Sequence, residues 1–151
     1  DGGTRIPFML RWPAKVKPQV SDVFVCQMDL LASFASLLGQ TYPDKVDSEN
    51  TLDAFLGKSK KEVVQPYYYV QFDNHATGYR GLRTSTHTFA VHATNGKIDE
   101  TVLYDRTKDP YQMDNIAGQS PRLVRQFNKQ LKAWLLHTND SFAHYLETVT
   151  K

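Results

Sequence analysis

The segment from Thr101 to Ala117 constrains the fold of this 151-residue chain more than any other. It begins with an apolar strand candidate, 101–104, turns at Asp109-Pro110 and then leads into a helix. Aspartate before proline is typical of turns, because its carboxylate accepts hydrogen bonds from nearby backbone N–H groups. The segment therefore predicts an α+β unit in which a strand closes a sheet and a helix follows it.

Three further strand candidates precede this segment. They span residues 67–72, 79–84 and 88–92, and all are rich in the aromatic and β-branched residues that strands favour. The links between the four candidates are short and polar. We therefore expect a four-stranded antiparallel meander.

The helix after the turn has its own start signal and its own apolar face. Ser120-Pro121 predicts a capping serine followed by proline at the first helical position. The apolar side chains that follow form one stripe at helical spacing: Leu123, Val124, Phe127, Leu131, Trp134 and Leu135. We expect this helix to cover one face of the sheet, and a last short helix to span 142–149.

The first forty residues predict two further elements. Residues 6–12 are apolar enough for a buried strand, and residues 29–38 repeat apolar side chains at helical spacing. Asp29 is the expected N-terminal cap of that helix, and Gly39 is its expected stop. A strand and a helix are therefore expected before the sheet begins.

A polar stretch from Gln40 to Pro66 separates these elements from the sheet. Within it, only 52–56 has the apolar spacing of a short helical turn. We therefore predict two domains, residues 1–60 with the strand, helix and connector, and residues 61–151 with the antiparallel sheet and its helix.

Charge and hydropathy limit the partners. Lys and Arg together number 18 and Asp and Glu 16, so the net charge of +2 does not call for nucleic acid or an anionic membrane. No apolar run approaches the ~20 residues of a membrane span. The single cysteine, Cys26, excludes an internal disulfide framework and does not identify the compartment.

The sequence lacks the motifs that mark common catalytic and metal sites. It contains no Gly-x-Ser-x-Gly elbow, no phosphate-binding Gly-x-x-x-x-Gly-Lys pattern and no His-Glu-x-x-His pair. Asp105, Asp109 and Asp114 do not follow the spacing of a calcium loop, so we expect them in turns and caps. We therefore predict no catalytic residue, no metal ligand and no cofactor within this chain.

The loop between the first two strands is the candidate binding site. It brings Asn74, His75 and Arg80 together along the chain. An arginine fork fits sulfate or carboxylate, and histidine can donate or relay a proton near neutral pH. We expect these three residues to bind substrate; the alternative is a polar hairpin in which Arg80 forms a structural ion pair.

Four short motifs also carry a family resemblance. They lie at residues 1–13, 28–33, 80–84 and 103–115. They resemble four segments of type I sulfatases, in the alkaline phosphatase superfamily, and they occur in the same order. The family segments are, in turn, Glu-Gly-Gly-x-Arg-x-Pro-x-x-x-x-Trp-Pro, Asp-Leu-Leu-Pro-Thr, Ala-Val-Arg-Thr and Leu-Tyr-Asp-Leu-x-x-Asp-Pro-x-Glu-x-x-Asn-Leu. The departures include Gln112, where the family usually has glutamate.

The resemblance implies the C-terminal portion of a sulfuric ester hydrolase acting on a sulfated sugar or aryl sulfate. The strand and helix before the sheet would then belong to the edge of a larger α/β sulfatase domain. The family's nucleophile is a formylglycine made within a Cys/Ser-x-Pro-x-Arg motif, and its metal is calcium. Cys26 is followed by Gln27-Met28-Asp29 and does not match that motif. The parent's nucleophile and metal are therefore expected upstream, and this chain alone is expected to be inactive.

The same resemblance implies that the chain helps to shape the substrate pocket of the parent enzyme. Its partners would be the N-terminal sulfatase domain and the sulfated substrate. The apolar surface of residues 1–40 is expected to seek a partner, including a second copy of the chain. By resemblance the parent is expected to be exported, to a periplasmic, lysosomal or secreted location.

Two other functions stay open on the residues alone. One is a non-catalytic module that binds carbohydrate or anions through the loop at Asn74, His75 and Arg80. The other is a related phosphatase or phosphodiesterase, because these enzymes share the larger fold. The ending at residues 103–115 favours the sulfatase over the phosphoryl-transfer enzymes.

Overall fold

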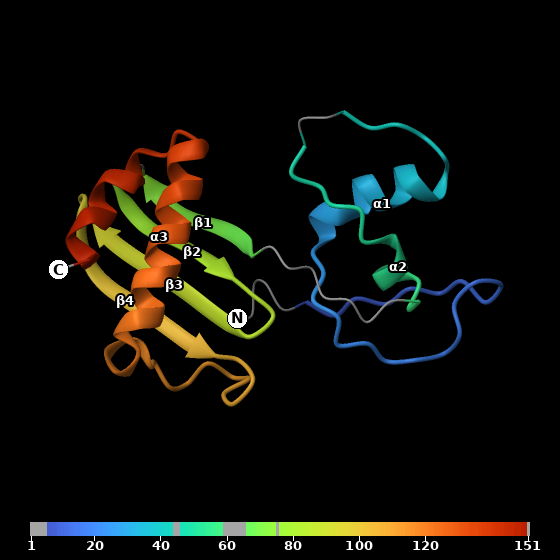
Figure 1. The fold of residues 1–151 in the computed structure, drawn as a ribbon, viewed down its shortest axis with the longest axis horizontal. Helices are drawn as coiled ribbons and strands as arrows, with labels where there is room; N and C mark the ends of the chain where they lie inside the picture. Colours follow the sequence, from blue (N-terminus) through green and yellow to red (C-terminus); the bar gives the residue numbers. More distant parts are fainter. Residues whose placement is uncertain (1–5, 44–45, 59–65, 75, 151) are drawn as a thin grey trace. The chain divides into compact units, whose positions relative to one another are not determined.

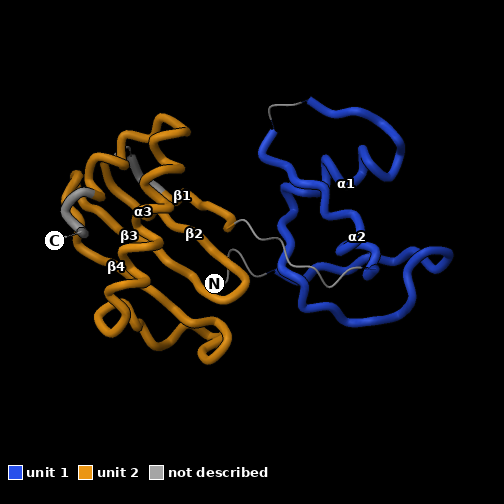
Figure 2. The backbone as a smooth tube through the Cα atoms, viewed as in Figure 1, with its two compact units in different colours: residues 1–65 blue, residues 66–151 orange. Residues whose placement is uncertain are grey.

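The computed structural model describes residues 6–43, 46–58, 66–74 and 76–150, with only the backbone described for 72–74 and 147–150. The chain forms two compact units, residues 1–65 and residues 66–151, which Figure 2 shows in different colours. Each unit has its own secondary structure and is described by itself. None of the helices in the described ranges is both long and apolar enough to cross a membrane.

The second unit is built on an antiparallel sheet. Its strands are β1 (Tyr67–Asn74), β2 (Thr77–Arg83), β3 (His87–Thr94) and β4 (Lys97–Asp105), and they pair in the order β1-β2-β3-β4. Each strand pairs with the next along the chain, so the sheet is a meander. The prediction of four antiparallel strands is confirmed, and each strand contains most of its predicted range.

Helix α3 (Pro121–His137) covers one face of this sheet, as Figure 1 shows. Side chains alternate between the two faces of a strand, and those on the inner face meet the apolar stripe of the helix. The fully buried members of this core include Leu82, Phe89, Val91, Leu103, Leu131, Leu135, Phe142 and Leu146. At the margin of the core, the rings of Tyr68 and Trp134 stack with their centroids 4.6 Å apart. The predicted covering helix is therefore confirmed.

The ends of α3 partly differ from the prediction. Pro121 occupies the first turn as expected, but the Ser120 side chain does not cap the helix. The Ser120 carbonyl instead accepts the N–H groups of Leu123 and Val124, both at 3.0 Å. The predicted last helix is a 3-10 helix, η3 (Ser141–Thr150), and its Phe142 and Leu146 complete the core.

The outer edge of β4 is covered by the residues that follow the Asp-Pro turn. Asn115 Oδ1 accepts the N–H groups of Leu103 and Ala117, both at 3.0 Å, and Asn115 Nδ2 donates to the Thr101 carbonyl at 3.0 Å. The Ile116 N–H donates to the Leu103 carbonyl at 2.9 Å. An edge strand exposes a row of unpaired backbone groups that other chains can join. Asn115 and Ile116 satisfy those groups along the middle of β4.

The aspartates of this segment hold its turns, as the sequence predicts. Asp105 Oδ1 accepts the Thr107 N–H at 3.0 Å and the Thr107 hydroxyl at 2.5 Å, which lowers the pKa of Asp105. Asp109 Oδ2 accepts the Asp114 N–H at 2.8 Å. Gln112 takes up the left-handed backbone conformation, with φ of 57°. The Asp-Pro segment therefore works as a structural turn that returns the chain to the edge of the sheet.

The first unit contains η1 (Gln27–Asp29), α1 (Leu30–Leu37) and the short α2 (Leu52–Phe55). Helix α1 ends as predicted: Gly39 has φ of 63°, its N–H donates to the Ser36 carbonyl, and the Gln40 N–H donates to the Ala35 carbonyl at 2.8 Å. This is the Schellman pattern, in which glycine takes up the left-handed conformation without strain. The predicted helix and its stop are confirmed.

The start of α1 corrects the predicted cap. Asp29 stands at the cap position, but its side chain bonds no N–H of the helix. Its Oδ1 instead accepts the Glu49 N–H at 3.0 Å, while Ser48 Oγ accepts the Ala32 N–H at the helix start at 2.9 Å. The capping hydroxyl therefore comes from a segment distant along the chain. Together these bonds hold 48–51 against the first turn of α1.

The strand predicted over 6–12 is absent from the described residues. This segment has no strand hydrogen bonds, and its Phe8 and Met9 side chains are 53% and 92% exposed. A strand forms only beside another strand, because its backbone groups need partners. No strand is described within the first unit, so the apolar pattern of 6–12 has nothing to pair with there.

Replacing Asn115 by alanine is expected to lower the free energy of unfolding by about 1–3 kcal/mol, because the buried Leu103 N–H loses its acceptor. Urea denaturation of the chain measures this loss. Asp114→Ala is the matched control, since only the backbone N–H of Asp114 makes the bond to Asp109. Equal losses in the two variants would contradict the proposed cover of the β4 edge.

Candidate functional site

The candidate site is the loop between β1 and β2. The two strands pair up to Asn74 and Thr77, with a register irregularity between Phe72 and Asn74. Asn74 is described by its backbone, and His75 lies outside the described residues. The candidate loop thus joins two paired strands, with Asn74 at the end of β1 and Arg80 within β2.

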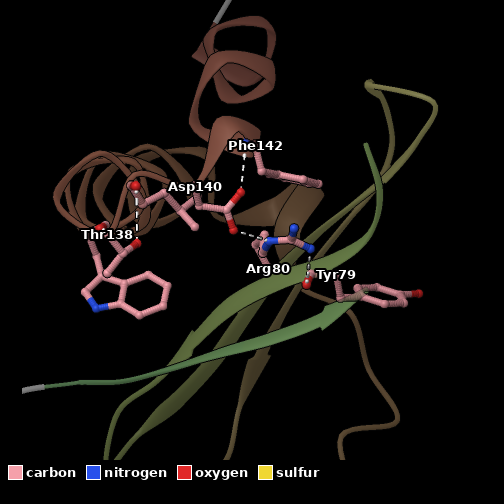
Figure 3. Close-up of polar contacts among 7 residues, drawn as sticks. Tyr79, Arg80, Thr138, Asp140 and Phe142 are labelled. Atoms are coloured by element: carbon pink, nitrogen blue, oxygen red, sulfur yellow. Dashed lines mark hydrogen bonds and ion pairs between the residues drawn. The ribbon is translucent and has the colours of Figure 1, made fainter. Parts of the chain in front are cut away.

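Arg80 points from β2 into the layer between the sheet and the helices (Figure 3). Its side chain is 2% exposed, and its Nε donates to Asp140 Oδ2 at 2.7 Å. Its Nη1 donates to the Tyr79 carbonyl at 3.2 Å. The guanidinium also lies over the Phe142 ring, 4.7 Å from the centroid. A buried charge needs a partner of this kind, because leaving water is costly.

Asp140 joins this ion pair to the turn between α3 and η3. Its Oδ1 accepts the Phe142 N–H at 2.9 Å, and its own N–H donates to the Leu135 carbonyl at 2.8 Å. Asn139, just before it, has φ of 57°, so the chain turns sharply there. Both carboxylate oxygens of Asp140 are therefore used, one by Arg80 and one by the first turn of η3. The geometry is that of the structural ion pair that the sequence left as the alternative.

A second polar cluster lies on the opposite face of the sheet, because Tyr79 alternates with Arg80 along β2. The Tyr79 hydroxyl donates to Glu100, which raises the pKa of Tyr79 to about 12. The Tyr79 ring also packs against the His92 ring, with centroids 4.5 Å apart. The cluster thus joins β2, β3 and β4 on the face that α3 does not cover.

His92 extends this cluster to the end of β4. A carboxylate can only accept, so His92 Nδ1 donates to Asp99 Oδ1 at 2.6 Å, and the Thr94 hydroxyl donates to Asp99 Oδ2 at 2.5 Å. These two hydrogen bonds lower the pKa of Asp99, the Thr94 bond contributing most. The pairing of β3 and β4 shifts between His92 and Ala93, which places Asp99 outside the regular register. This cluster was not predictable from the sequence, because period-two alternation does not indicate such a shift.

The described part of the chain offers no metal centre. No three His, Cys, Asp or Glu side chains in it come together in a way that could hold an ion. His87 Nδ1 bonds the Thr86 hydroxyl at 2.8 Å, and His137 and His144 are exposed. These three histidines are therefore hydrogen-bonded or exposed to solvent.

Comparison with known proteins relates this chain to one family of enzymes. A family model described as N-sulphoglucosamine sulphohydrolase, C-terminal, matches residues 1–140. An N-acetylgalactosamine-6-O-sulfatase from Bacteroides thetaiotaomicron is 33% identical over 141 residues, which cover 88% of this chain and 28% of the relative. An endo-4-O-sulfatase from the same organism is 26% identical and covers 89% of this chain and 30% of the relative.

Solved structures agree with these relatives. The crystal structure of yidJ, a Bacteroides fragilis protein assigned to the sulfatases, is 49% identical with a TM-score of 0.72, covering 89% of this chain and 30% of that one. A sulfatase of Bacteroides thetaiotaomicron from a study of glycosaminoglycan metabolism is 32% identical with a TM-score of 0.70, covering 87% and 29%. The chain belongs to the sulfatase family and corresponds to its C-terminal portion. It spans under a third of the length of these relatives.

Replacing Asp140 by alanine is expected to lower the free energy of unfolding by about 3 kcal/mol, because it leaves the buried Arg80 cation without its carboxylate. Asp99→Ala is the control: its ion pair with His92 is equally short, but its side chain is 43% exposed. Exposed pairs contribute little, so the control is expected to lose much less. Urea denaturation of both variants in parallel measures the two losses in free energy of unfolding. Similar losses would contradict the expectation that the buried Arg80–Asp140 pair stabilises the fold more than the exposed pair.

Proposed function

We propose that this chain is the C-terminal part of a sulfuric ester hydrolase that removes sulfate from a sulfated sugar. The match of one sulfatase family model to residues 1–140 is the observation that carries the proposal. The relative with 33% identity acts, by its name, on 6-O-sulfated N-acetylgalactosamine, and the similarity extends over most of this chain. Aryl sulfates are the second substrate class, since an arylsulfatase of Hemicentrotus pulcherrimus is 35% identical over 71 residues.

The chemical step is proposed to take place on residues outside this chain. The family implies a formylglycine and a calcium ion, and the residues present here do not fit either group. Cys26 lacks the following proline and arginine of the formylglycine motif, and the described acidic residues form no metal cluster. We therefore derive no catalytic step through either group, and the chain by itself is expected to release no sulfate.

The proposed role of the second unit is to form one side of the substrate pocket. Asn74 and His75, at the end of the β1–β2 hairpin, are proposed to contact the sugar, because amide and imidazole groups bond hydroxyls and sulfate oxygens. Arg80 is proposed to support the pocket indirectly, by stabilising the fold through its ion pair with Asp140, since its side chain is 2% exposed. Under this proposal Asn74 and His75 contact substrate, whereas Arg80 has a structural role.

The first unit is proposed to be the end of the main sulfatase domain, with the N-terminal part of the enzyme as its partner. Several of its large apolar side chains are exposed, among them Met9 at 92%, Val20 at 95% and Leu38 at 70%. Exposed apolar surface of this extent is typical of interaction sites. We propose that the upstream sheet of the parent covers this surface, and that 6–12 becomes a strand by pairing there.

The function is tested with the complete gene product that contains this chain. It is incubated with 6-O-sulfated N-acetylgalactosamine and with an aryl sulfate, and free sulfate is measured by ion chromatography. We expect release with the complete protein and none with residues 1–151 alone. His75→Ala in the complete protein is expected to raise KM by about tenfold, since one charge-assisted contact is lost.

Three results would contradict the proposal. Sulfate release by the 151-residue chain alone would show that the chemistry lies within it. A complete protein that releases phosphate from phosphate esters, and no sulfate from any sulfated substrate, would indicate the related phosphoryl-transfer enzymes. Submillimolar glycan binding by the chain alone, together with an inactive complete protein, would favour a non-catalytic binding module.

A further inference from the structure

Helix α3 carries a row of cations on the side that faces away from the sheet. Arg122, Arg125 and Lys129 are all exposed, and they follow one another at intervals of three and four residues. Side chains at these intervals lie on one face of a helix, with Cβ atoms about 5–6 Å apart. Phe127 and Leu131, on the other side, are buried in the core. The three cations therefore form a basic row along the outer face of the second unit.

The helix itself has no acidic side chain to offset this charge. Between Pro121 and His137 there is no aspartate or glutamate. Within the described part of the chain, the three side chains of the basic row make no ion pair. The positive charge of the row is therefore available to an anion from outside the chain.

The basic row is unfavourable for the helix on its own. Arg122 lies in the first turn, where the aligned peptide dipoles place partial positive charge and a cation is repelled. Arg122 and Arg125 are like-charged neighbours, and so are Arg125 and Lys129, and such pairs destabilise a helix. The buried stripe of α3 already fixes the helix on the sheet, so folding does not account for these cations. Residues that oppose local stability in this way are typical of functional surfaces.

The layout of the row matches an extended polyanion. Because an α-helix rises about 1.5 Å per residue, Arg122 and Lys129 are about 10 Å apart along its axis. A single small anion fits between two neighbouring cations, whereas a chain with repeated negative charges contacts all three. Cations spread along one line therefore indicate a linear ligand with several charges.

The groups beside the row favour a glycan over a single-stranded nucleic acid. Gln126 and Gln130 are exposed, and each follows a cation of the row by one position. Their amides can donate to and accept from sugar hydroxyls. The two aromatic residues of α3 are engaged with the sheet, since Phe127 is 5% exposed and Trp134 stacks on Tyr68. They offer no platform on the outer face for stacked bases.

We propose that the basic row of α3 is a second binding surface, outside the substrate pocket, for the chain of a sulfated polysaccharide. Its cations bind sulfate groups of sugars other than the one that is hydrolysed, through charge-assisted hydrogen bonds. A polymer held at two places gains affinity, because the second contact is intramolecular. The choice of a sulfated glycan rests on the proposed function, whereas the polyanion surface rests on the charges and their layout.

Binding is tested first with the 151-residue chain and a fluorescently labelled chondroitin 6-sulfate decasaccharide, by fluorescence anisotropy. The triple variant Arg122→Gln, Arg125→Gln, Lys129→Gln is the basic-row variant. Its Kd is expected to be at least about tenfold higher in ~0.1 M salt, because three charge-assisted contacts are lost. Its affinity is also expected to depend less steeply on salt, because fewer counterions are exchanged.

The matched control is the triple variant Lys15→Gln, Lys17→Gln, Lys97→Gln. It removes the same charge at exposed positions outside α3. Its Kd is expected to stay within about twofold, because distant exposed charges are screened at this salt concentration. The basic-row variant is expected to unfold at no lower urea concentration than the unmodified chain, since glutamine suits a helix and the like-charged pairs are removed. A loss of binding therefore reports the surface and not the fold.

The basic-row variant is then compared with the unmodified sequence in the complete gene product, by sulfate release. KM for the sulfated decasaccharide is expected to rise about fivefold or more, because only a long substrate reaches both surfaces. KM for 6-O-sulfated N-acetylgalactosamine, and kcat for both substrates, are expected to stay within about twofold, because the pocket is unchanged.

Three outcomes overturn the proposal. One is an equal Kd for the decasaccharide in the basic-row variant and the control. Another is an active complete protein in which the basic-row variant keeps the KM for the decasaccharide. The third is a basic-row variant that loses binding to a DNA duplex and keeps binding to the decasaccharide, which would assign the surface to nucleic acid. A complete protein without sulfatase activity overturns the proposed function, while the Kd values still decide whether the row binds a sulfated chain.

Discussion

The contact between α3 and the inner face of the sheet is the interaction on which the second unit depends. An isolated helix of this length is marginal in water, and a single sheet with one apolar face is not stable by itself. Here each element supplies what the other lacks: Leu131 and Leu135 of the helix are fully buried, as are Phe89 and Leu103 of the sheet. Both strands that lead to and from the candidate site belong to this layer.

Much of that layer follows from local patterns in the sequence. Strands and helices with one buried face leave a periodic apolar signal, and the four strands and α3 appear where this signal predicts them. The stop of α1 at Gly39 follows from the backbone freedom of glycine, and the turns at Asp105 and Asp109 follow from carboxylates that accept nearby N–H groups. In each of these cases the residues that decide the outcome are close neighbours in the sequence.

The features that the sequence did not predict depend on partners far along the chain. Ser48 caps α1 in place of Asp29, and Asp140 pairs with Arg80 across 60 positions. The strand expected over 6–12 needs a neighbouring strand that the first unit does not provide. For the candidate site, the loop was predictable from its residue types, but the direction of the Arg80 side chain was not, because one polar residue in a strand faces either side according to register.

Native-state hydrogen exchange of the 151-residue chain, followed through increasing urea, tests the central claim most directly. If the helix–sheet contact holds the unit together, the amides of α3 and those of β2 and β3 open with one common free energy and are lost together at the same urea concentration. Opening of α3 at a much lower free energy, with the strands still protected, would contradict the account. The sheet would then be stable without its helix, and the Arg80–Asp140 pair could not support the candidate site.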